Sequence, residues 1–176
     1  AGQSVTTGVQ NTLIGALAGD AISTGYDNVA VGYLALSAAT SGYDNVAVGG
    51  EALAANTGIN NTAVGHKSAY TNTTGTQNSA LGTYSLFANT SGDFNTAVGY
   101  TALAANTTAD NNTAVGLAAL NANTTGSENT AVGTSALAAN TTADSNVAVG
   151  FKSLLVNTTG TANTGLGEST LRANTT

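Results

Sequence analysis

The sequence predicts an all-β fold, a parallel β-solenoid of ten coils with about 17 residues in each. Two observations predict it: one motif recurs at an almost constant spacing, and Ala, Thr, Gly and Asn supply 107 of the 176 residues. A chain this poor in bulky apolar residues cannot fill the core of an ordinary layered domain, because alanine buries little area. Stacked coils need no such core, since each coil buries its apolar face against its neighbours.

The recurring motif is an Asn followed three residues later by an aliphatic residue and then by Gly. The spacing is 17 residues throughout, except for 16 residues between Asn45 and Asn61. We therefore expect residues 1–10 to form a partial leading coil and residues 11–176 to form a single solenoid domain of ten coils. Each coil is numbered here from its motif Asn, as positions 1 to 17. The motif residues are Asn11, Asn28, Asn45, Asn61, Asn78, Asn95, Asn112, Asn129, Asn146 and Asn163.

Positions 2 to 4 of each coil alternate in the manner of a short strand with one buried face. The aliphatic residue at position 4 is expected on the buried face, as a ladder formed by Val31, Val48, Val64, Leu81, Val98, Val115, Val132 and Val149. The Ala at position 3 is then expected on the other face, where a strip of methyl groups would let neighbouring rods approach closely. This strip predicts side-by-side self-association, as in a trimer. An end-to-end filament is the other expectation, because the repeat reaches both ends of the chain without the change of pattern that caps a solenoid.

A Gly at position 5 suits a tight bend after the strand. A second apolar ladder follows at position 9, with Leu36, Leu53, Leu86, Leu103, Leu120, Leu137 and Leu154. The segment around these leucines, such as residues 100–106, is open to two interpretations. It forms either a second extended segment or a short helical turn, because Ala and Leu favour helix.

The second bend has the consensus N-T-T-G, which is rich in turn-forming residues. The motif Asn at position 1 is interpreted as an internal hydrogen-bonding ladder, and its members include Asn28, Asn45, Asn61, Asn78, Asn95, Asn112, Asn129 and Asn146. The bend also repeats an N-x-[ST] sequon, which leaves glycosylation open beside ordinary turn chemistry. The candidate glycosylation sites are Asn72, Asn89, Asn106, Asn123, Asn140 and Asn157.

The composition excludes several functions. Without Cys there is no disulfide framework, and three basic residues cannot neutralise a nucleic-acid backbone. No apolar run approaches the roughly 18 residues of a membrane span. The single His66 lacks a catalytic partner, so we expect no enzyme, no cofactor and no metal centre. Calcium remains open only at four turn acids, Asp27, Asp44, Asp110 and Asp144.

Units such as Asn95–Gly99 and Asn112–Gly116 resemble the repeats of trimeric autotransporter adhesin heads of the YadA type. The longer unit Asn112–Gly126 is similar to repeats in bacteriophage tail fibres. The resemblance covers essentially the whole chain. It implies a left-handed parallel β-roll, usually assembled as a trimer, in an extracellular or virion-borne fibre. The chain departs from the adhesin heads in its longer period.

The favoured hypothesis is a non-catalytic structural protein of an extracellular fibre or filament, either a phage tail-fibre shaft or a bacterial surface adhesin. The rod would display its turns toward a cell-surface receptor or glycan, through exposed residues that include Tyr26, Tyr33, Tyr43, Tyr70 and Tyr100. The alternative is a soluble ice-binding or glycan-binding solenoid. An ice-binding face needs two Thr on the same side of a strand, and adjacent pairs such as Thr107 and Thr108 point to opposite sides.

Overall fold

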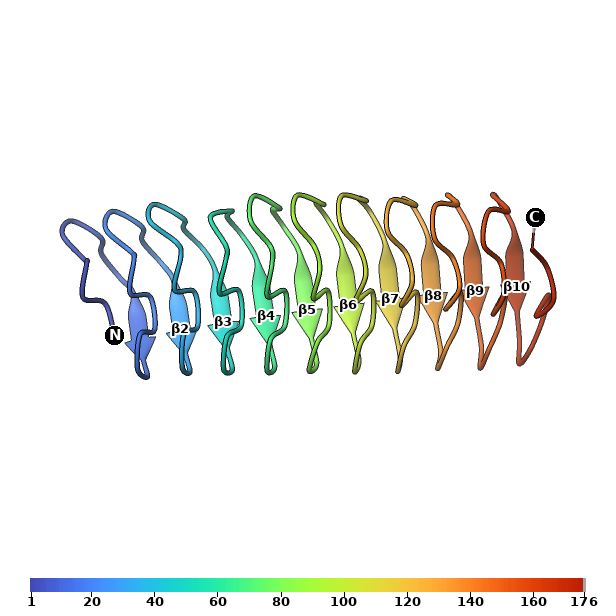
Figure 1. Cartoon of the computed structure of the whole chain (residues 1–176), viewed down its shortest axis with the longest axis horizontal. Helices are drawn as coiled ribbons and strands as arrows, with labels where there is room; N and C mark the ends of the chain where they lie inside the picture. Colours follow the sequence, from blue (N-terminus) through green and yellow to red (C-terminus); the bar gives the residue numbers. More distant parts are fainter. Residues whose placement is uncertain (176) are drawn as a thin grey trace.

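The computed structural model describes residues 1–175, and it confirms the β-solenoid. Ten strands of three residues form one parallel sheet in sequence order, so the chain is a rod with its termini at opposite ends (Figure 1). At about 4.8 Å between strands, the sheet is about 45 Å long. The strands are β1 (Thr12–Ile14), β2 (Val29–Val31), β3 (Val46–Val48), β4 (Thr62–Val64), β5 (Ser79–Leu81), β6 (Thr96–Val98), β7 (Thr113–Val115), β8 (Thr130–Val132), β9 (Val147–Val149) and β10 (Thr164–Leu166).

Every strand pairs with the same coil positions of its neighbours, so that Thr96, Ala97 and Val98 of β6 lie opposite Thr113, Ala114 and Val115 of β7. After the strand, the chain turns at positions 5 to 7, the lower turn row of Figure 1. It returns along a back segment at positions 8 to 11 and turns again at positions 12 to 17, the upper turn row. Residues 2–8 extend the stack by one partial coil, with the Gly2 and Thr6 amides bonded to the Ala18 and Ser23 carbonyls.

The strand faces the opposite way from our prediction. The position-3 alanines point into the rod, and Ala30, Ala97 and Ala114 are fully buried. The position-4 ladder points outward: Val31, Val48, Val64, Val98, Val115 and Val132 are half-buried, while Leu81 and Val149 are exposed. The reason is the narrow interior. A Cβ at Gly165, which replaces the position-3 Ala in β10, would lie 2.6 Å from Ser153 Oγ and 3.2 Å from Leu154 Cγ.

The described residues contain no helix, so the helical interpretation of the back segment is wrong. The Leu at position 9 adopts a left-handed conformation instead, with φ of 53° at Leu103 and 52° at Leu120. This conformation costs an L-residue about 1–2 kcal/mol. The Leu103 amide donates to the Ala119 carbonyl of the next coil at 2.9 Å, and the same bond joins Leu120 to Ala136. Bonds between coils therefore replace the local bonds of a helix.

The core is a thin column of Ala and Leu that runs along the rod. The position-9 leucines Leu36, Leu53, Leu86, Leu103, Leu120, Leu137 and Leu154 are all fully buried. They pack with alanines from positions 3 and 8, which come from opposite walls of the coil. Small residues on one wall and leucines on the other let the two walls lie close together, which is why a chain with so few bulky side chains still forms a core.

Gly at position 5 is required by the bend. Gly116 has a φ of 131°, which L side chains rarely adopt. A Cβ there would also lie 2.7 Å from the backbone of Gly133 in the next coil. The bend and the close stacking therefore both exclude a side chain.

Candidate functional site

The motif Asn at position 1 forms a ladder through the interior, the first Asn ladder. The Asn112 amide N–H donates to Asn95 Oδ1 at 3.0 Å, and the Asn129 N–H donates to Asn112 Oδ1 at the same distance. Across the coil, Asn112 Nδ2 donates to the Gly126 carbonyl at 2.9 Å. Each side chain thus ties its own coil closed and bonds the next coil. The ladder residues from Asn28 to Asn146 are buried.

A second Asn ladder, which we did not predict from the sequence, runs at position 12. Asn106 Nδ2 donates to Asn89 Oδ1 at 2.8 Å and to the Ala109 carbonyl at 3.0 Å. Asn123 Nδ2 then donates to Asn106 Oδ1 at 3.0 Å. The signal in the sequence was the recurrence of Asn at position 12, at the same 17-residue spacing as in the first ladder.

These position-12 residues are the candidate glycosylation sites, and the structure argues against that role in the folded chain. Asn72, Asn89, Asn106, Asn123, Asn140 and Asn157 are all fully buried. The amide nitrogen that would carry a sugar already donates two hydrogen bonds inside the rod, at Asn106 as at Asn72. A glycan cannot be placed there without unfolding the turn.

The outward face of the sheet carries two straight columns of side chains, here called the outer strip. Position 2 supplies hydroxyl or aliphatic groups and position 4 supplies aliphatic groups, with the buried alanine between them. The strip contains no charged residue. Its members are Thr12, Val29, Val46, Thr62, Ser79, Thr96, Thr113, Thr130, Val147 and Thr164 at position 2, and Ile14, Val31, Val48, Val64, Leu81, Val98, Val115, Val132, Val149 and Leu166 at position 4.

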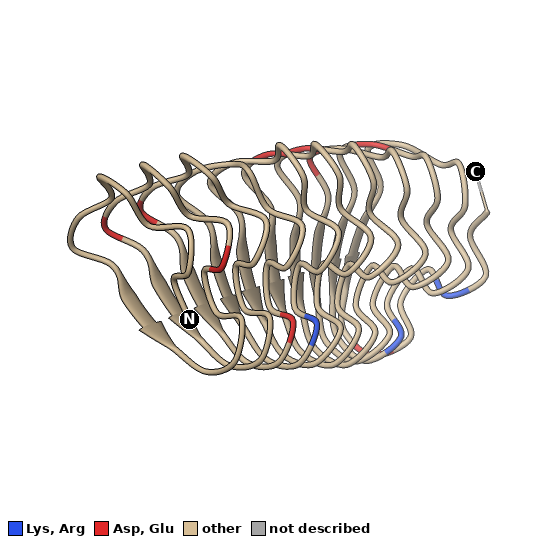
Figure 2. Cartoon of the chain, turned by 60° about the vertical axis from the view of Figure 1, so that its left-hand side comes forward, with Lys and Arg blue, Asp and Glu red and all other residues tan. Residues whose placement is uncertain are grey.

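The net charge of -6 is carried entirely by the upper turn row, because the charges elsewhere cancel. That row carries six acids and no base, namely Asp27, Asp44, Asp93, Asp110, Glu128 and Asp144. The other three acids, Asp20, Glu51 and Glu168, balance the three bases Lys67, Lys152 and Arg172. Figure 2 shows the basic residues along one row of turns and most of the acids along the other.

The four candidate calcium ligands do not meet at one place. Asp27 and Asp44 occupy position 17 of consecutive coils, whereas Asp110 and Asp144 occupy position 16 two coils apart. Asp110 Oδ1 accepts the Asp93 N–H at 2.7 Å, and Asp144 Oδ1 accepts the Ser127 N–H at 2.8 Å. Within residues 1–175, no group of three or more His, Asp or Glu side chains is arranged to hold a metal ion.

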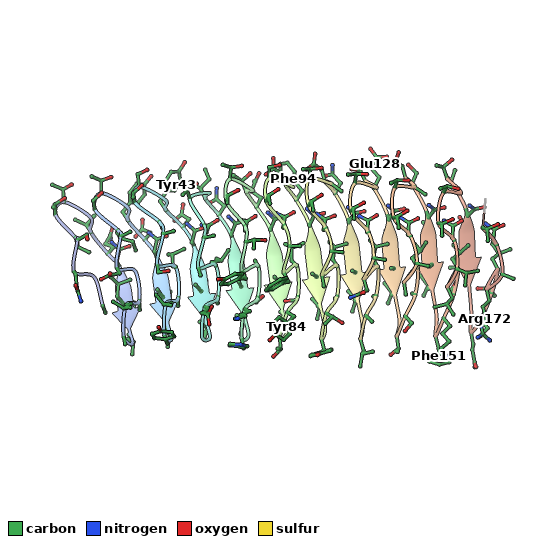
Figure 3. The ribbon with its side chains drawn as sticks, viewed as in Figure 1. Tyr43, Tyr84, Phe94, Glu128, Phe151 and Arg172 are labelled. Atoms are coloured by element: carbon green, nitrogen blue, oxygen red, sulfur yellow. The ribbon has the colours of Figure 1, made fainter. Side chains whose placement is uncertain are left out.

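Of the tyrosines that we expected to be exposed, four lie on the two turn rows and Tyr70 lies on the back segment; Tyr43 and Tyr70 are half-buried. Tyr26 and Tyr43 stack on the upper row, with ring centroids 4.8 Å apart. Partial loss of water, together with Tyr43 and the carboxylates of Asp44 and Asp27, raises the pKa of Tyr26 above its usual value. Tyr33 and Tyr100 point outward from the lower row and are 55% and 54% exposed. Side chains line both rows in Figure 3, with Tyr43, Phe94 and Glu128 along the upper turns and Tyr84, Phe151 and Arg172 along the lower.

The surface of the described part of the chain is not hollowed into a pocket. Nor does that part contain a helix able to cross a membrane. What the chain offers to a partner is therefore its outside: the outer strip and the two turn rows. No protein-family model, no curated protein and no solved structure matches this chain.

Proposed function

We propose that this chain is a non-catalytic structural rod of an extracellular fibre, either a phage tail-fibre shaft or a bacterial surface filament. The observation that carries the proposal is the unbroken repetition of one coil. A single ten-stranded parallel sheet and the first Asn ladder run the length of the described chain, and the second Asn ladder runs from Asn56 onward, because Ile22 and Ala39 occupy position 12 in the first two coils. Because every coil bonds the next in the same way, added coils lengthen the rod without changing its cross-section.

The ladders suit a load-bearing part. From the third coil on, the first ladder, the second ladder and the sheet all bond to the neighbouring coil. Threonine hydroxyls at position 13 add another line of bonds, from Thr107 Oγ1 to the Thr124 carbonyl and from Thr124 Oγ1 to the Thr141 carbonyl, both at 2.9 Å. A force along the rod is thus shared by parallel rows of hydrogen bonds.

The proposed fibre is a side-by-side assembly that uses the outer strip in place of the alanine face that we first expected. The strip is about 45 Å long and about 10 Å wide, or about 450 Å². This equals the largest exposed apolar patch of a typical monomer, but only about half of the ~800 Å² that each partner buries in a stable interface. We therefore expect ten coils to associate weakly and longer rods to associate more tightly.

Light scattering coupled to size-exclusion chromatography, with negative-stain microscopy, tests this proposal. The wild-type chain should form trimers or bundled rods as its concentration rises. Val98→Lys and Val115→Lys place charges on the outer strip and should leave a monomer. Leu117→Lys adds the same charge at a 53% exposed site on the lower turn row, and should assemble like the wild type. A wild-type chain that stays monomeric at millimolar concentration would contradict the proposal.

Ice binding is the second candidate function, and the outer strip favours it. Positions 2 and 4 of each strand supply two outward residues with one inward residue between them, although only position 2 carries Thr and position 4 is always Val, Leu or Ile. Six of the ten strands begin with Thr. Thermal hysteresis in a monomeric sample, abolished by Val98→Lys, would favour this function over the fibre. Assembly without hysteresis would favour the fibre.

A further inference from the structure

One cluster of rings, here called the aromatic patch, spans the lower turn row and the adjoining back segment. Its members are His66, Tyr84 and Tyr100 on the lower turns and Tyr70 and Phe87 on the back segment. It holds half of the ten aromatic and imidazole side chains of the chain within the coils of β4, β5 and β6. His66 and Tyr100 are exposed, and the other three rings are half-buried. The patch lies on the side of the rod marked by Tyr84 in Figure 3.

Tyr84 is the centre of the patch. Its ring lies edge-on to His66 of the preceding coil, with centroids 5.8 Å apart, and edge-on to Tyr100 of the following coil at 6.4 Å. It also contacts Phe87 of its own coil edge-on at 5.5 Å. Phe87 in turn stacks on Tyr70, with centroids 5.5 Å apart and planes 7° from parallel. The five rings therefore form one continuous apolar surface over three coils, about 10 Å along the axis.

Both signs of charge rim the patch. Lys67 Nζ lies 5.3 Å from the centre of the Tyr70 ring and 3.7 Å from Glu51 Oε2. The side chains of Thr83 and Thr101 occupy the same turns as Tyr84 and Tyr100 and are half-buried. Donors and acceptors thus surround the rings, and the formal charges of Lys67 and Glu51 cancel.

The fold does not need these rings. The coils of β7 and β8 make the same lower turn with Ala118 and Ser135 in place of Tyr84, and the same back segment with Asn121 and Ala138 in place of Phe87. The backbone hydrogen bonds are equivalent, since the Thr101 amide donates to the Thr83 carbonyl and the Ala118 amide donates to the Tyr100 carbonyl. An aromatic group that the turn can omit is available for a ligand.

We propose that the aromatic patch binds a neutral oligosaccharide. A sugar ring presents an apolar C–H face to an aromatic ring and hydroxyl groups to the polar rim, which matches this arrangement. The absence of a pocket in the described chain favours a linear ligand laid along the surface over a small molecule that must be enclosed. The balanced rim favours a neutral glycan over an anionic one. The site lies on the lower turn row and the back segment, so it does not depend on assembly through the outer strip.

NMR titration of the wild-type chain with cellohexaose, chitohexaose and maltohexaose tests the proposal. At least one saccharide should shift the resonances of His66 and Tyr100 and leave those of Tyr43, on the upper turn row, unchanged. Tyr84→Ala and Tyr100→Ala should each weaken binding by about tenfold or more, the effect of removing one stacking ring. Tyr33→Ala is the matched control, because Tyr33 has the same coil position and exposure as Tyr100 but lies outside the cluster.

Three results would overturn the proposal: no shift with any of the saccharides at millimolar concentration, shifts spread evenly along the rod, or an equal loss of affinity in Tyr33→Ala. Thermal unfolding of each variant shows whether it is folded, and Tyr100→Ala removes only an exposed ring, so it keeps the test valid if Tyr84→Ala unfolds. The fibre proposal is tested separately, by measuring the oligomeric state of the same samples with light scattering. A monomer that binds sugar supports this inference alone.

Discussion

The upper and lower turn rows reverse the chain in every coil, but they do so by different means. In the upper row, side chains make the turn. The amide of Asn106 closes it onto the Ala109 carbonyl, the Thr107 hydroxyl bonds the next coil, and the Asp110 carboxylate accepts an N–H from the preceding coil. The sequence of this row is therefore nearly fixed from position 12 to position 15.

In the lower row, the backbone makes the turn. Gly99 supplies a φ of 133° that only glycine adopts readily, and the amides of Gly99 and Thr101 donate to the preceding coil. Positions 6 and 7 contribute no required side chain, and residues as different as His66, Lys67 and Leu117 occupy them. A turn that is held by the backbone therefore leaves its side chains free to vary. The variable surface of the rod is for that reason on the lower row.

The largest expected effect comes from breaking a side-chain turn. Asn106→Leu removes two donated hydrogen bonds and leaves Asn123 Nδ2 without one of its acceptors, inside a buried ladder. At about 1 kcal/mol for each lost or unsatisfied hydrogen-bonding group, the free energy of unfolding should fall by about 3 kcal/mol. Urea denaturation followed by circular dichroism measures this change.

Asn121→Leu is the control for that variant. Asn121 lies on the half-buried back segment and donates one bond, to the Thr101 carbonyl at 2.9 Å. Its loss should cost less than about 1 kcal/mol. Equal losses in the two variants would show that position 12 has no special role.

The next effect tests the backbone turn. Gly116→Ala forces a side chain onto a φ of 131° and toward the Gly133 backbone, so we expect a loss of about 2–3 kcal/mol. Gly50→Ala, at position 6 of the lower row, should cost under about 1 kcal/mol, because a Cβ there approaches no atom closer than His66 Nδ1 at 3.3 Å and other coils carry large side chains at that position. The midpoints of urea unfolding compare the two. A Gly50→Ala variant as unstable as Gly116→Ala would show that the backbone conformation at position 5 has no special role.

A smaller effect follows from charge. The six acids of the upper row repel one another and the lower row is neutral, so added salt should stabilise the chain by a few tenths of a kcal/mol through screening. Asp44→Asn removes one of two acids in consecutive coils and should reduce this dependence on salt. Glu168→Gln, in the lower row, should leave it unchanged or increase it. Thermal unfolding at low and high NaCl distinguishes these outcomes.

The smallest effect concerns Tyr26. Its pKa is raised in the folded chain, so the neutral hydroxyl is favoured there. This shift stabilises the folded chain at pH values below the usual pKa of tyrosine, about 10. The stabilisation is lost as the pH rises through the higher pKa that Tyr26 has in the folded chain. In a spectrophotometric titration of the tyrosines, Tyr26→Phe should remove the latest-ionising component. Retention of that component in Tyr26→Phe would contradict the shift.

Much of this molecule could be predicted from its sequence. The spacing of the motif Asn residues gave the parallel solenoid, the coil length and the strand at positions 2 to 4. The first Asn ladder followed from the same spacing. The acids and the missing Cys could be read directly from the sequence, since they depend on residue type alone. The exposure of the tyrosines could not, because Tyr26, Tyr33 and Tyr100 are exposed but Tyr43 and Tyr70 are half-buried.

The sequence could not decide which face of a three-residue strand is buried. Alternation shows that Ala97 and Val98 point to opposite sides, and general hydrophobicity then favours the larger valine inside. The opposite wall of the coil settles the matter, because Leu103 and Ala102 already fill the narrow interior and leave room only for alanine. The same error concealed the outer strip.

By itself, the sequence determined that the chain stacks in coils, because a fixed period allows each residue type to meet its own copy in the next coil. Only the tertiary structure decided what each position does there. The position-12 asparagines became a buried ladder and not glycan sites, since the stacked turn closes over them. The leucines entered a left-handed conformation and not a helix, since their amides bond the next coil. Five rings from three coils became one patch, because a period of 17 residues places them side by side.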